Sequence, residues 1–305
     1  MAKITVIGSF VMDNVATAER FPQAGETVLG KTLACFPGGK GANQCVSAAR
    51  LGGDVEMIGM LGKDANGEVF RGILKAEGVR ADHVFSCEQP TAVAQIQIDA
   101  QGQNRICVIP CANYEFGFEE LEKIDDVLRR TALVVLQLEM RLDVTEEIIR
   151  RVHAYGGKIL LNPAPAVPLD RHVLGMVDYL TPNETELSVL TGMPTESEEQ
   201  VIAAAEKLLS YGTKAVVATL GSRGALIAER GRAEIVRGYR VKAVDTVAAG
   251  DSFNGALAVA LTEGRDLFSA VRFANATGAL TVQKQGAIPS LHTRAEVEDF
   301  IKAFG

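Results

Sequence analysis

The stretch from residue 245 to residue 257, DTVAAGDSFNGAL, joins a turn of small residues to an apolar helical pattern. The first amides of a helix have no intrahelical partner and attract anions. The side chains of Ala248, Ala249 and Gly250 are small enough for a phosphate to reach those amides. Asp251 adds a carboxylate there, and a base beside a phosphate favours phosphoryl transfer. The alternative is that Asp251 only caps the helix.

A second stretch, PGGKGANQ at residues 37–44, precedes another helical pattern. Its glycines, Gly38, Gly39 and Gly41, allow backbone amides to approach a ligand, and Asn43 can both donate hydrogen bonds to hydroxyl groups and accept them. These properties suit a sugar. The alternative is a plain glycine-rich turn before a helix. The stretch lacks the spacing of a Walker A loop and of a GxGxxG dinucleotide turn.

Isolated polar residues elsewhere are further candidates. Asp13 stands among apolar residues and either caps an element or meets a polar ligand. Glu139 follows an expected strand, and in open α/β sheets such strand ends face the ligand crevice; the alternative is a solvated loop residue. Asn183 and Glu186 are three residues apart, so on a helix they either hold a hydrated metal or a phosphate together or form a capping box.

Two turns complete the set of candidates. TLGSRG, residues 219–224, follows a strand pattern and could receive a nucleotide. KQGAIPS, residues 284–290, could coordinate a monovalent cation together with Asp245 and the Val247 carbonyl. Neither turn is specific by itself.

The secondary structure expected to position these residues changes along the chain, from short strands to alternating helices and strands. Short β-rich runs occupy residues 82–86, 91–98 and 104–109, and the middle one alternates as a half-exposed strand does. From residue 118 onward helices and strands alternate, which is typical of a parallel sheet covered by helices. We expect helices at 118–129, 143–154 and 267–284 and strands at 132–138 and 158–162.

Size and charge limit the function classes. The chain has 305 residues, 47% of them hydrophobic, which is enough for a large core in one α/β domain. The formal net charge of −7 argues against a nucleic-acid partner. The N-terminal run MAKITVIGSF resembles a strand more than a leader, and no segment offers about 18 uninterrupted apolar residues. We therefore expect a cytoplasmic protein without a membrane partner.

Cysteine and histidine do not carry the chemistry. The five cysteines are odd in number and form no CxxC pair, which favours buried cytosolic thiols over disulfides or zinc. The four histidines have no partner at metal-ligand spacing, so histidine-based catalysis is not expected.

Five motifs in order resemble the ribokinase family of carbohydrate kinases, also called the PfkB family; they are GGKGANQ (38–44), NPAPA (162–166), TPNETE (181–186), TLGSRG (219–224) and DTVAAGDSFNGAL (245–257). The resemblance implies an α/β fold, a doubly wound, mostly parallel sheet with a small β lid. It assigns residues 1–9, 37–90 and 111–305 to the nucleotide- and sugar-binding domain and residues 10–36 and 91–110 to the lid. It also implies a homodimer formed through the lid.

The resemblance implies a role for each matching residue. Asp251 would be the general base, and the amides of Ala248, Ala249 and Gly250 would hold the γ-phosphate. The sugar contacts would be Asp13, Gly39, Lys40, Gly41, Asn43 and Glu139. The nucleotide site would comprise Asn183, Thr219, Leu220, Gly221, Ser222, Arg223, Gly224, Gly250 and Asn275. Glu186 would organise Mg²⁺ indirectly, and K⁺ would be held by Asp245, Val247, Thr281, Lys284, Gly286 and Ser290.

Two residues depart from the family pattern. Val11 stands where ribokinases usually carry asparagine, and Cys111 stands where glycine is usual. Valine cannot bond a sugar hydroxyl, and deoxyribose kinases are similar in having an apolar residue there. The first expectation is transfer of phosphate from ATP to D-ribose, giving D-ribose 5-phosphate and ADP. The alternatives are a kinase for 2-deoxyribose, another pentose or a ketohexose, a nucleoside kinase, and a non-catalytic sugar sensor on the same fold.

Overall fold

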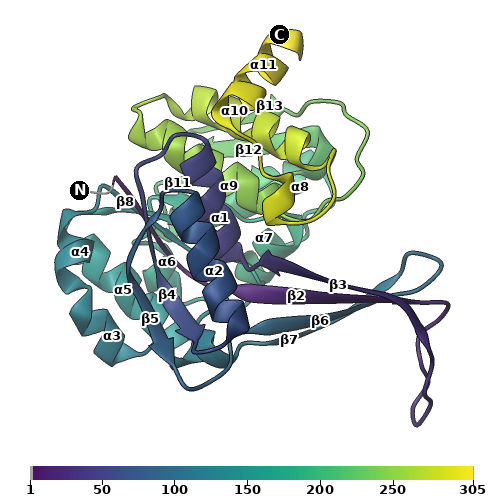
Figure 1. Ribbon diagram of the computed structural model, residues 1–305. Coiled ribbons are helices and arrows are strands. Elements are labelled where there is room, and N and C mark those ends of the chain that lie inside the picture. Colours follow the sequence, from purple (N-terminus) through teal and green to yellow (C-terminus); the bar gives the residue numbers. More distant parts are fainter. Residues whose placement is uncertain (1–2, 305) are drawn as a thin grey trace.

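The computed structural model describes residues 3–304 and centres on a nine-stranded sheet (Figure 1). The strand order is β13-β12-β11-β10-β9-β8-β1-β4-β5, in which the strands from β11 to β5 pair in parallel and β12 and β13 are antiparallel. The strands are β1 (Ile4–Ile7), β4 (Val55–Gly62), β5 (Arg80–Cys87), β8 (Leu133–Leu136), β9 (Lys158–Leu161), β10 (Tyr179–Leu180), β11 (Ala215–Thr219), β12 (Gly224–Glu229) and β13 (Arg232–Arg237).

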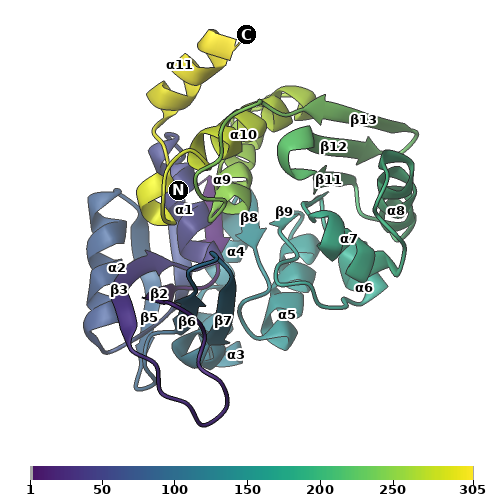
Figure 2. The same cartoon turned by 90° about the vertical axis from the view of Figure 1, so that its right-hand side faces the viewer.

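Two hydrophobic cores lie on opposite faces of this sheet. Successive residues of β8 alternate between them, since Leu133 and Val135 pack in one core and Val134 and Leu136 in the other. One core contains α1 (Lys40–Arg50), α2 (Ala65–Ala76), α9 (Ala249–Thr262), α10 (Leu267–Thr281) and α11 (Arg294–Phe304). The other contains α3 (Phe118–Lys123), α4 (Asp125–Arg130), α5 (Leu142–Ala154), α6 (Arg171–Leu174), α7 (Glu184–Thr191) and α8 (Glu198–Ser210). Figure 2 shows α8 and α10 on opposite sides of strands β11 to β13.

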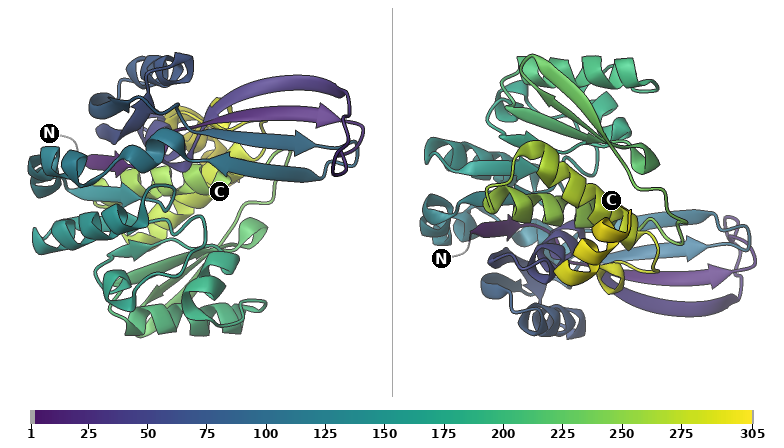
Figure 3. Two further views of the ribbon diagram at one scale, coloured as in Figure 1. Left: turned by 90° about the horizontal axis from the view of Figure 1, so that it is seen from below. Right: turned by 90° about the horizontal axis from the view of Figure 1, so that it is seen from above.

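A second sheet of four strands projects from the body (Figures 1 and 3). Its order is β3-β2-β6-β7, formed by β2 (Val11–Ala18), β3 (Gly30–Gly38), β6 (Val93–Ile98) and β7 (Asn104–Ile109). Every residue of the edge strand β7 is exposed. These strands come from the two segments expected to form the lid, although β3 continues to Gly38. The division of the chain into two domains stays a prediction.

Two expected helices are shorter in the structure. The helix expected at 118–129 is divided at Ile124, whose amide bonds the Leu121 carbonyl and whose side chain is fully buried in the core. The helix expected at 267–284 ends at Thr281. The carbonyl of Val282 accepts hydrogen bonds from the amides of Val244 and Asp245, at 2.7 and 3.1 Å, so the chain leaves the helix there.

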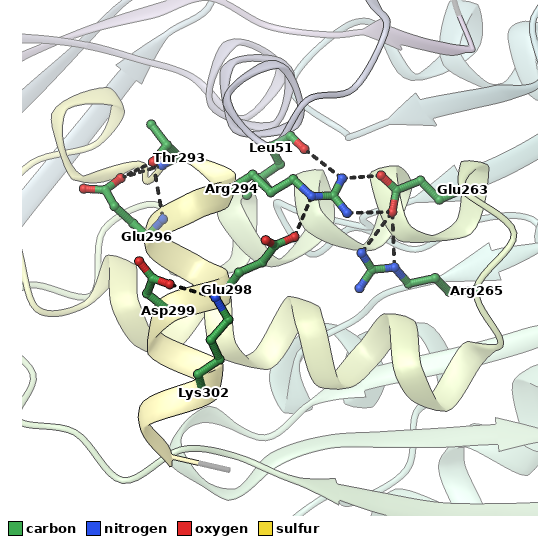
Figure 4. A network of polar contacts seen from close by, with 9 residues as sticks. All are labelled: Leu51, Glu263, Arg265, Thr293, Arg294, Glu296, Glu298, Asp299 and Lys302. Carbon is green, nitrogen blue, oxygen red and sulfur yellow. Dashed lines mark hydrogen bonds and ion pairs between the residues drawn. The ribbon is translucent and has the colours of Figure 1, made fainter.

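Arg294 fastens the C-terminal helix α11 to the body (Figure 4). Its guanidinium donates to Glu298 at 2.8 Å, to the Leu51 carbonyl at 3.4 Å and to Glu263. The hydrogen bond to Glu263 raises the pKa of Arg294 above its usual value. Leu51 ends α1 and Glu263 ends α9, so this clamp ties α11 to the C-terminal ends of both helices.

The sequence also predicted the absence of membrane-spanning segments and the state of the cysteines. Within residues 3–304, no helix combines the length and the apolar character needed to cross a membrane. All five cysteines are free thiols, but only Cys45 is buried; the prediction of buried thiols was wrong for Cys35 and Cys107, which are exposed on strands of the second sheet.

Candidate active site

Helix α1 begins at the point where the chain passes from lid strand β3 back to the main body, before β4. Gly39 precedes the helix with φ 88°, and a Cβ on it would lie 2.6 Å from the Val11 amide nitrogen, so glycine is required there. The Glu139 carboxylate accepts hydrogen bonds from the Lys40 amide, at 3.0 Å, and from the Ser9 hydroxyl. Glu139 therefore lies at the positive end of α1 rather than being a freely solvated loop residue.

Helix α9 begins with a backbone suited to an anion. Ala248 precedes it in the left-handed region, with φ 60°, which is uncommon for a residue with a side chain. The amides of Gly250 and Asp251 lie in the first turn, where a helix supplies no acceptor. Gly250 is exposed, and a Cβ built on it would meet no atom within 4 Å. There is thus open space in front of these amides.

Asp251 does not cap the helix, so that alternative was wrong. It is the third residue of α9, and its side chain is 7% exposed. Its Oδ2 accepts a hydrogen bond from Asn43 Nδ2 at 2.8 Å, and its Oδ1 accepts one from Gln44 Nε2 at 3.1 Å. The buried Asn43 Oδ1 has no hydrogen-bond partner within residues 3–304. An unpartnered acceptor beside the carboxylate suits a hydroxyl donor.

A cleft of about 420 Å³ joins the starts of α1 and α9 with the lid sheet. It is lined by half of the residues expected from the sequence, namely Val11, Asp13, Gly39, Lys40, Asn43, Glu139, Asn183, Glu186, Thr219, Val247, Ala248, Gly250 and Asp251. The lid adds an apolar wall of Ala94, Ile96, Ile106 and Val108, and Asn162, Ala164, Thr246 and Asn254 complete the lining. These residues come from segments far apart in sequence.

Some expected nucleotide residues lie outside the cleft lining. The Asn275 side chain is buried and donates to the Val236 carbonyl at 3.0 Å, so it links α10 to β13. Leu220 is buried, and Gly221, Ser222, Arg223 and Gly224 form the turn between β11 and β12. Arg223 forms an ion pair with Glu184 at the start of α7. Gly41 lies behind the cleft, where a Cβ would be 2.4 Å from the Ser9 nitrogen.

Asn183 and Glu186 form the capping box that the sequence left as one alternative. The Asn183 side chain accepts from the Glu186 amide, and the Glu186 carboxylate accepts from the Asn183 amide, both at 2.8 Å. Both residues also line the cleft, and burial raises the pKa of Glu186. Capping therefore fixes the two side chains at the cleft. Within residues 3–304, no three His, Cys, Asp or Glu side chains gather to hold a metal ion directly.

Asp245 connects the turn before α9 to the segment after α10. Its Oδ1 accepts from the Val247 amide and its Oδ2 from the Gly286 amide, both at 3.0 Å. Other expected potassium residues make local contacts, since Thr281 Oγ1 donates to the Thr277 carbonyl and Ser290 Oγ to the Ala287 carbonyl. Lys284 is exposed.

Carboxylates concentrate negative charge in the cleft. Burial, reinforced by the charges of Glu139 and Asp251, raises the pKa of Asp13 from 3.8 to about 6. Burial by itself would lower the pKa of Lys40, but surrounding carboxylates raise it above its usual value; they belong to Asp251, Glu139, Glu186 and Asp13. Lys40 thus remains a cation among four acids.

The raised pKa of Asp13 predicts that replacing it by asparagine stabilises the ligand-free protein. Above pH 6 the carboxylate is ionised in both states but less favourably in the folded one, so it costs up to about 3 kcal/mol. The cost disappears as the pH falls through 6 toward 4, where the folded state binds the proton first. Thermal unfolding without sugar should show Asp13→Asn melting a few degrees above the wild type at pH 7.5 and equal to it near pH 4. Asp82→Asn, at an exposed position, is the matched control. A lower melting temperature for Asp13→Asn at pH 7.5 would contradict this.

The sequence did not reveal a group of buried side-chain amides around Asp251. They are Gln44, Gln137, Asn162 and Asn254. Asn254 follows Asp251 at helical spacing, and its Nδ2 donates to the Gly250 carbonyl at 2.8 Å. A polar residue on the buried face of an otherwise apolar helix was the available signal.

The two departures from the family pattern lie in one small apolar cluster. Val11 packs there with Ala92 and Ala94, and Cys111 packs against the cluster. Cys111 has φ 38°, a conformation that glycine adopts more easily. The family's usual glycine is therefore understandable from the backbone alone.

Comparison with known proteins agrees with this geometry. Residues 1–294 match the pfkB family of carbohydrate kinases. The chain is 39% identical to a ribokinase of Bacillus subtilis over 308 residues, covering 99% of this chain and all of the relative, and 34% identical to a deoxyribokinase of Salmonella typhi, covering 98% of each. It is similar to the structure of Arabidopsis thaliana ribokinase complexed with ribose and ATP, with TM-score 0.91, 35% identity and 99% of each chain covered. The expected doubly wound α/β fold is thus confirmed, and the chain belongs to the pfkB family of carbohydrate kinases.

Proposed function

We propose that the protein is a ribokinase that transfers the γ-phosphate of ATP to the 5-hydroxyl of D-ribose, giving D-ribose 5-phosphate and ADP. The observation that carries the proposal is the start of α9, where the buried Asp251 carboxylate lines the cleft next to the first-turn amides of Gly250 and Asp251, for which the helix supplies no acceptor. The Ala249 amide donates to the Thr246 carbonyl at 3.3 Å instead. A hydroxyl bound between them would give its proton to Asp251. The amides would donate hydrogen bonds to the phosphoryl oxygens and stabilise the negative charge that develops on them.

The sugar would lie at the start of α1, under the lid. Asp13, Lys40 and Glu139 line that end of the cleft, and Asn43 offers its free Oδ1 to a hydroxyl donor. Gly39 lines the cleft there, whereas the Gly41 amide donates to the Ser9 hydroxyl at 3.3 Å behind it, so Gly41 would support the turn. Since Asn43 also bonds Asp251, the sugar and the base are aligned through one side chain.

ATP would lie across the ends of β10 and β11, with Mg²⁺ on its phosphates. Asn183, Glu186 and Thr219 line this end, and the turn 221–224 and Asn275 would complete the nucleotide site. With no direct cage in residues 3–304, Glu186 would act on Mg²⁺ through water, in keeping with the water that Mg²⁺ usually retains. Bound Mg²⁺ would neutralise phosphate charge.

A monovalent cation would lie between Asp245 and residues 281–290. Asp245 already connects the two segments, and the carbonyls of Val247, Thr281, Lys284 and Gly286 with the Ser290 hydroxyl would supply oxygen ligands. We predict several-fold faster turnover in K⁺ than in Na⁺, because an ion of the right size holds the turn before α9 in place. Initial rates at equal ionic strength measure this, and equal rates in both salts would argue against the site.

The same proposal includes a homodimer formed through the lid and a cytoplasmic location, where ATP is available. The large apolar side chain of Leu33 on lid strand β3 supports the dimer, since it is 72% exposed and does not line the cleft.

A second candidate substrate, 2-deoxyribose, is favoured by one residue. Val11 lines the cleft and cannot bond the hydroxyl that 2-deoxyribose lacks. A coupled ADP assay should compare ribose, 2-deoxyribose, fructose, tagatose and ribosides in the wild type and in Val11→Asn. We expect ribose to give the highest kcat/KM, and Val11→Asn to raise the preference for ribose over 2-deoxyribose by roughly 5- to 100-fold, the range of one buried hydrogen bond.

Each other outcome of that assay selects a different function. Preference of the wild type for 2-deoxyribose would replace the ribokinase assignment by that of a deoxyribose kinase. Preference for ribosides would make the protein a nucleoside kinase. Absence of ADP formation with every sugar would favour the hypothesis of a non-catalytic sugar sensor.

A further inference from the structure

A buried chain of three amide side chains, Gln137, Gln44 and Asn162, adjoins Asp251, and only Asn162 lines the cleft. Gln44 Nε2 donates to Asp251 Oδ1 and to Asn162 Oδ1, both at 3.1 Å. Gln44 Oε1 accepts from Gln137 Nε2 at 2.8 Å. Gln44 is fully buried, and Gln137 and Asn162 are 2% and 8% exposed. Gln44 and Gln137 do not line the cleft.

The orientation of the Gln44 amide is fixed by its neighbours. Asn162 Nδ2 donates to the Thr181 carbonyl at 3.2 Å, which leaves Asn162 Oδ1 facing Gln44 as an acceptor. An ionised Asp251 can only accept. A flipped Gln44 would therefore place its oxygen against two acceptors, Asp251 Oδ1 and Asn162 Oδ1. Gln137 does not decide the orientation, because its own Oε1 has no hydrogen-bond partner within residues 3–304 and its amide can turn with that of Gln44. The carboxamide has one satisfied orientation, and it aims an N–H at Asp251.

We propose that Gln44 is a positioning residue for Asp251, itself held by Gln137 and Asn162. Asn43 holds one carboxylate oxygen and Gln44 the other, so together they fix the rotation of the carboxylate about its side-chain bond. Loss of one donor leaves the carboxylate free to turn, and misplacement of a reacting group is costly to the rate. The inference rests on the proposed role of Asp251 as the base.

The test replaces Gln44 by methionine, which keeps the length of the side chain and removes the donor. We expect kcat to fall about 10- to 100-fold, with KM for sugar and ATP changed less than about threefold. The acid limb of the kcat–pH profile should move to higher pH by roughly one unit, because the ionised carboxylate loses an amide donor. Gln137→Leu, which touches Gln44 and not Asp251, should give a smaller loss of kcat with the same direction of pH shift.

The matched control is Ser47→Ala, one turn further along α1. The Ser47 hydroxyl donates to the Ser252 carbonyl at 3.2 Å, so this variant also removes a buried hydrogen bond between α1 and α9. We expect it to lower the melting temperature and leave kcat within twofold of the wild type. Sugar binding measured by calorimetry shows that each variant is folded.

Four results separate the possibilities. A kcat of Gln44→Met and Gln137→Leu equal to that of Ser47→Ala would overturn the positioning role. So would a loss of kcat with an unmoved pH profile, which is what general loosening of the fold gives. If Asp251→Asn in the same assay keeps normal turnover, the proposed base is wrong; if it is inactive while Gln44→Met is unaffected, only the positioning role is wrong.

Discussion

Replacement of Asp251 by asparagine should lower kcat by roughly 10³-fold and leave the affinity for the sugar within a few fold of the wild type. Asparagine has the size of aspartate but cannot take the proton from a hydroxyl. The sugar is bound mainly by other groups in the proposal, so its affinity is spared. The amide NH₂ of the new side chain faces one of two donors, from Asn43 or Gln44, so a stability loss of about 1–3 kcal/mol accompanies the change.

The measurement combines single-turnover kinetics with calorimetric titration of the sugar. Asp170→Asn, an N-cap at the start of α6 and remote from the cleft lining, shows what the same substitution does elsewhere. If Asp251→Asn turns over at near the wild-type rate, Asp251 is not the base.

Replacement of Gly250 by valine should abolish most turnover without unfolding the protein, with kcat/KM for ATP falling at least about 100-fold. Gly250 lies in the first turn of α9, has an ordinary helical backbone, and has no atom within 4 Å of a built Cβ. The valine side chain would therefore occupy the open space in front of the amides, where the γ-phosphate would bind. Alanine at this position should give a smaller loss.

Gly72 offers a matched control for this substitution. It lies within α2, is exposed, and likewise has no atom within 4 Å of a built Cβ. Gly72→Val should keep full activity, and both valine variants should melt cooperatively. Undiminished use of ATP by Gly250→Val would place the phosphate elsewhere than on these amides.

Most of the architecture could be predicted from the sequence because the patterns that indicate helices, strands and turns are local. Alternating helix and strand patterns after residue 118 indicated the parallel sheet, and the glycines around Lys40 and the small residues before Asp251 indicated the two helix starts. Each of these patterns is complete within about a dozen residues. Local chemistry also supplied both possibilities for Asn183 and Glu186, and the structure shows that the pair caps α7 while lining the cleft.

The contacts that the sequence did not reveal join distant segments. Gln44 meets Asp251 across 207 positions of the chain, and nothing near Gln44 distinguishes it from a polar residue on the surface of α1. Asn275 was assigned to the nucleotide site by resemblance alone, and nothing near it in sequence indicated that its side chain bonds the Val236 carbonyl on β13. The break at Ile124 depends on where the core accepts a buried side chain, which a helical pattern cannot specify.

The position of Asp13 on strand β2 couples substrate binding and product release to movement of the projecting sheet. Asp13 belongs to the projecting sheet, whereas Asp251 belongs to α9 in the body, and both face the same cleft. An outward swing of that sheet would carry one wall of the cleft, with its carboxylate, away from the other. The cleft therefore cannot bind its substrate fully while it is open to solvent. The product would leave when the sheet moves and the two walls of the pocket separate.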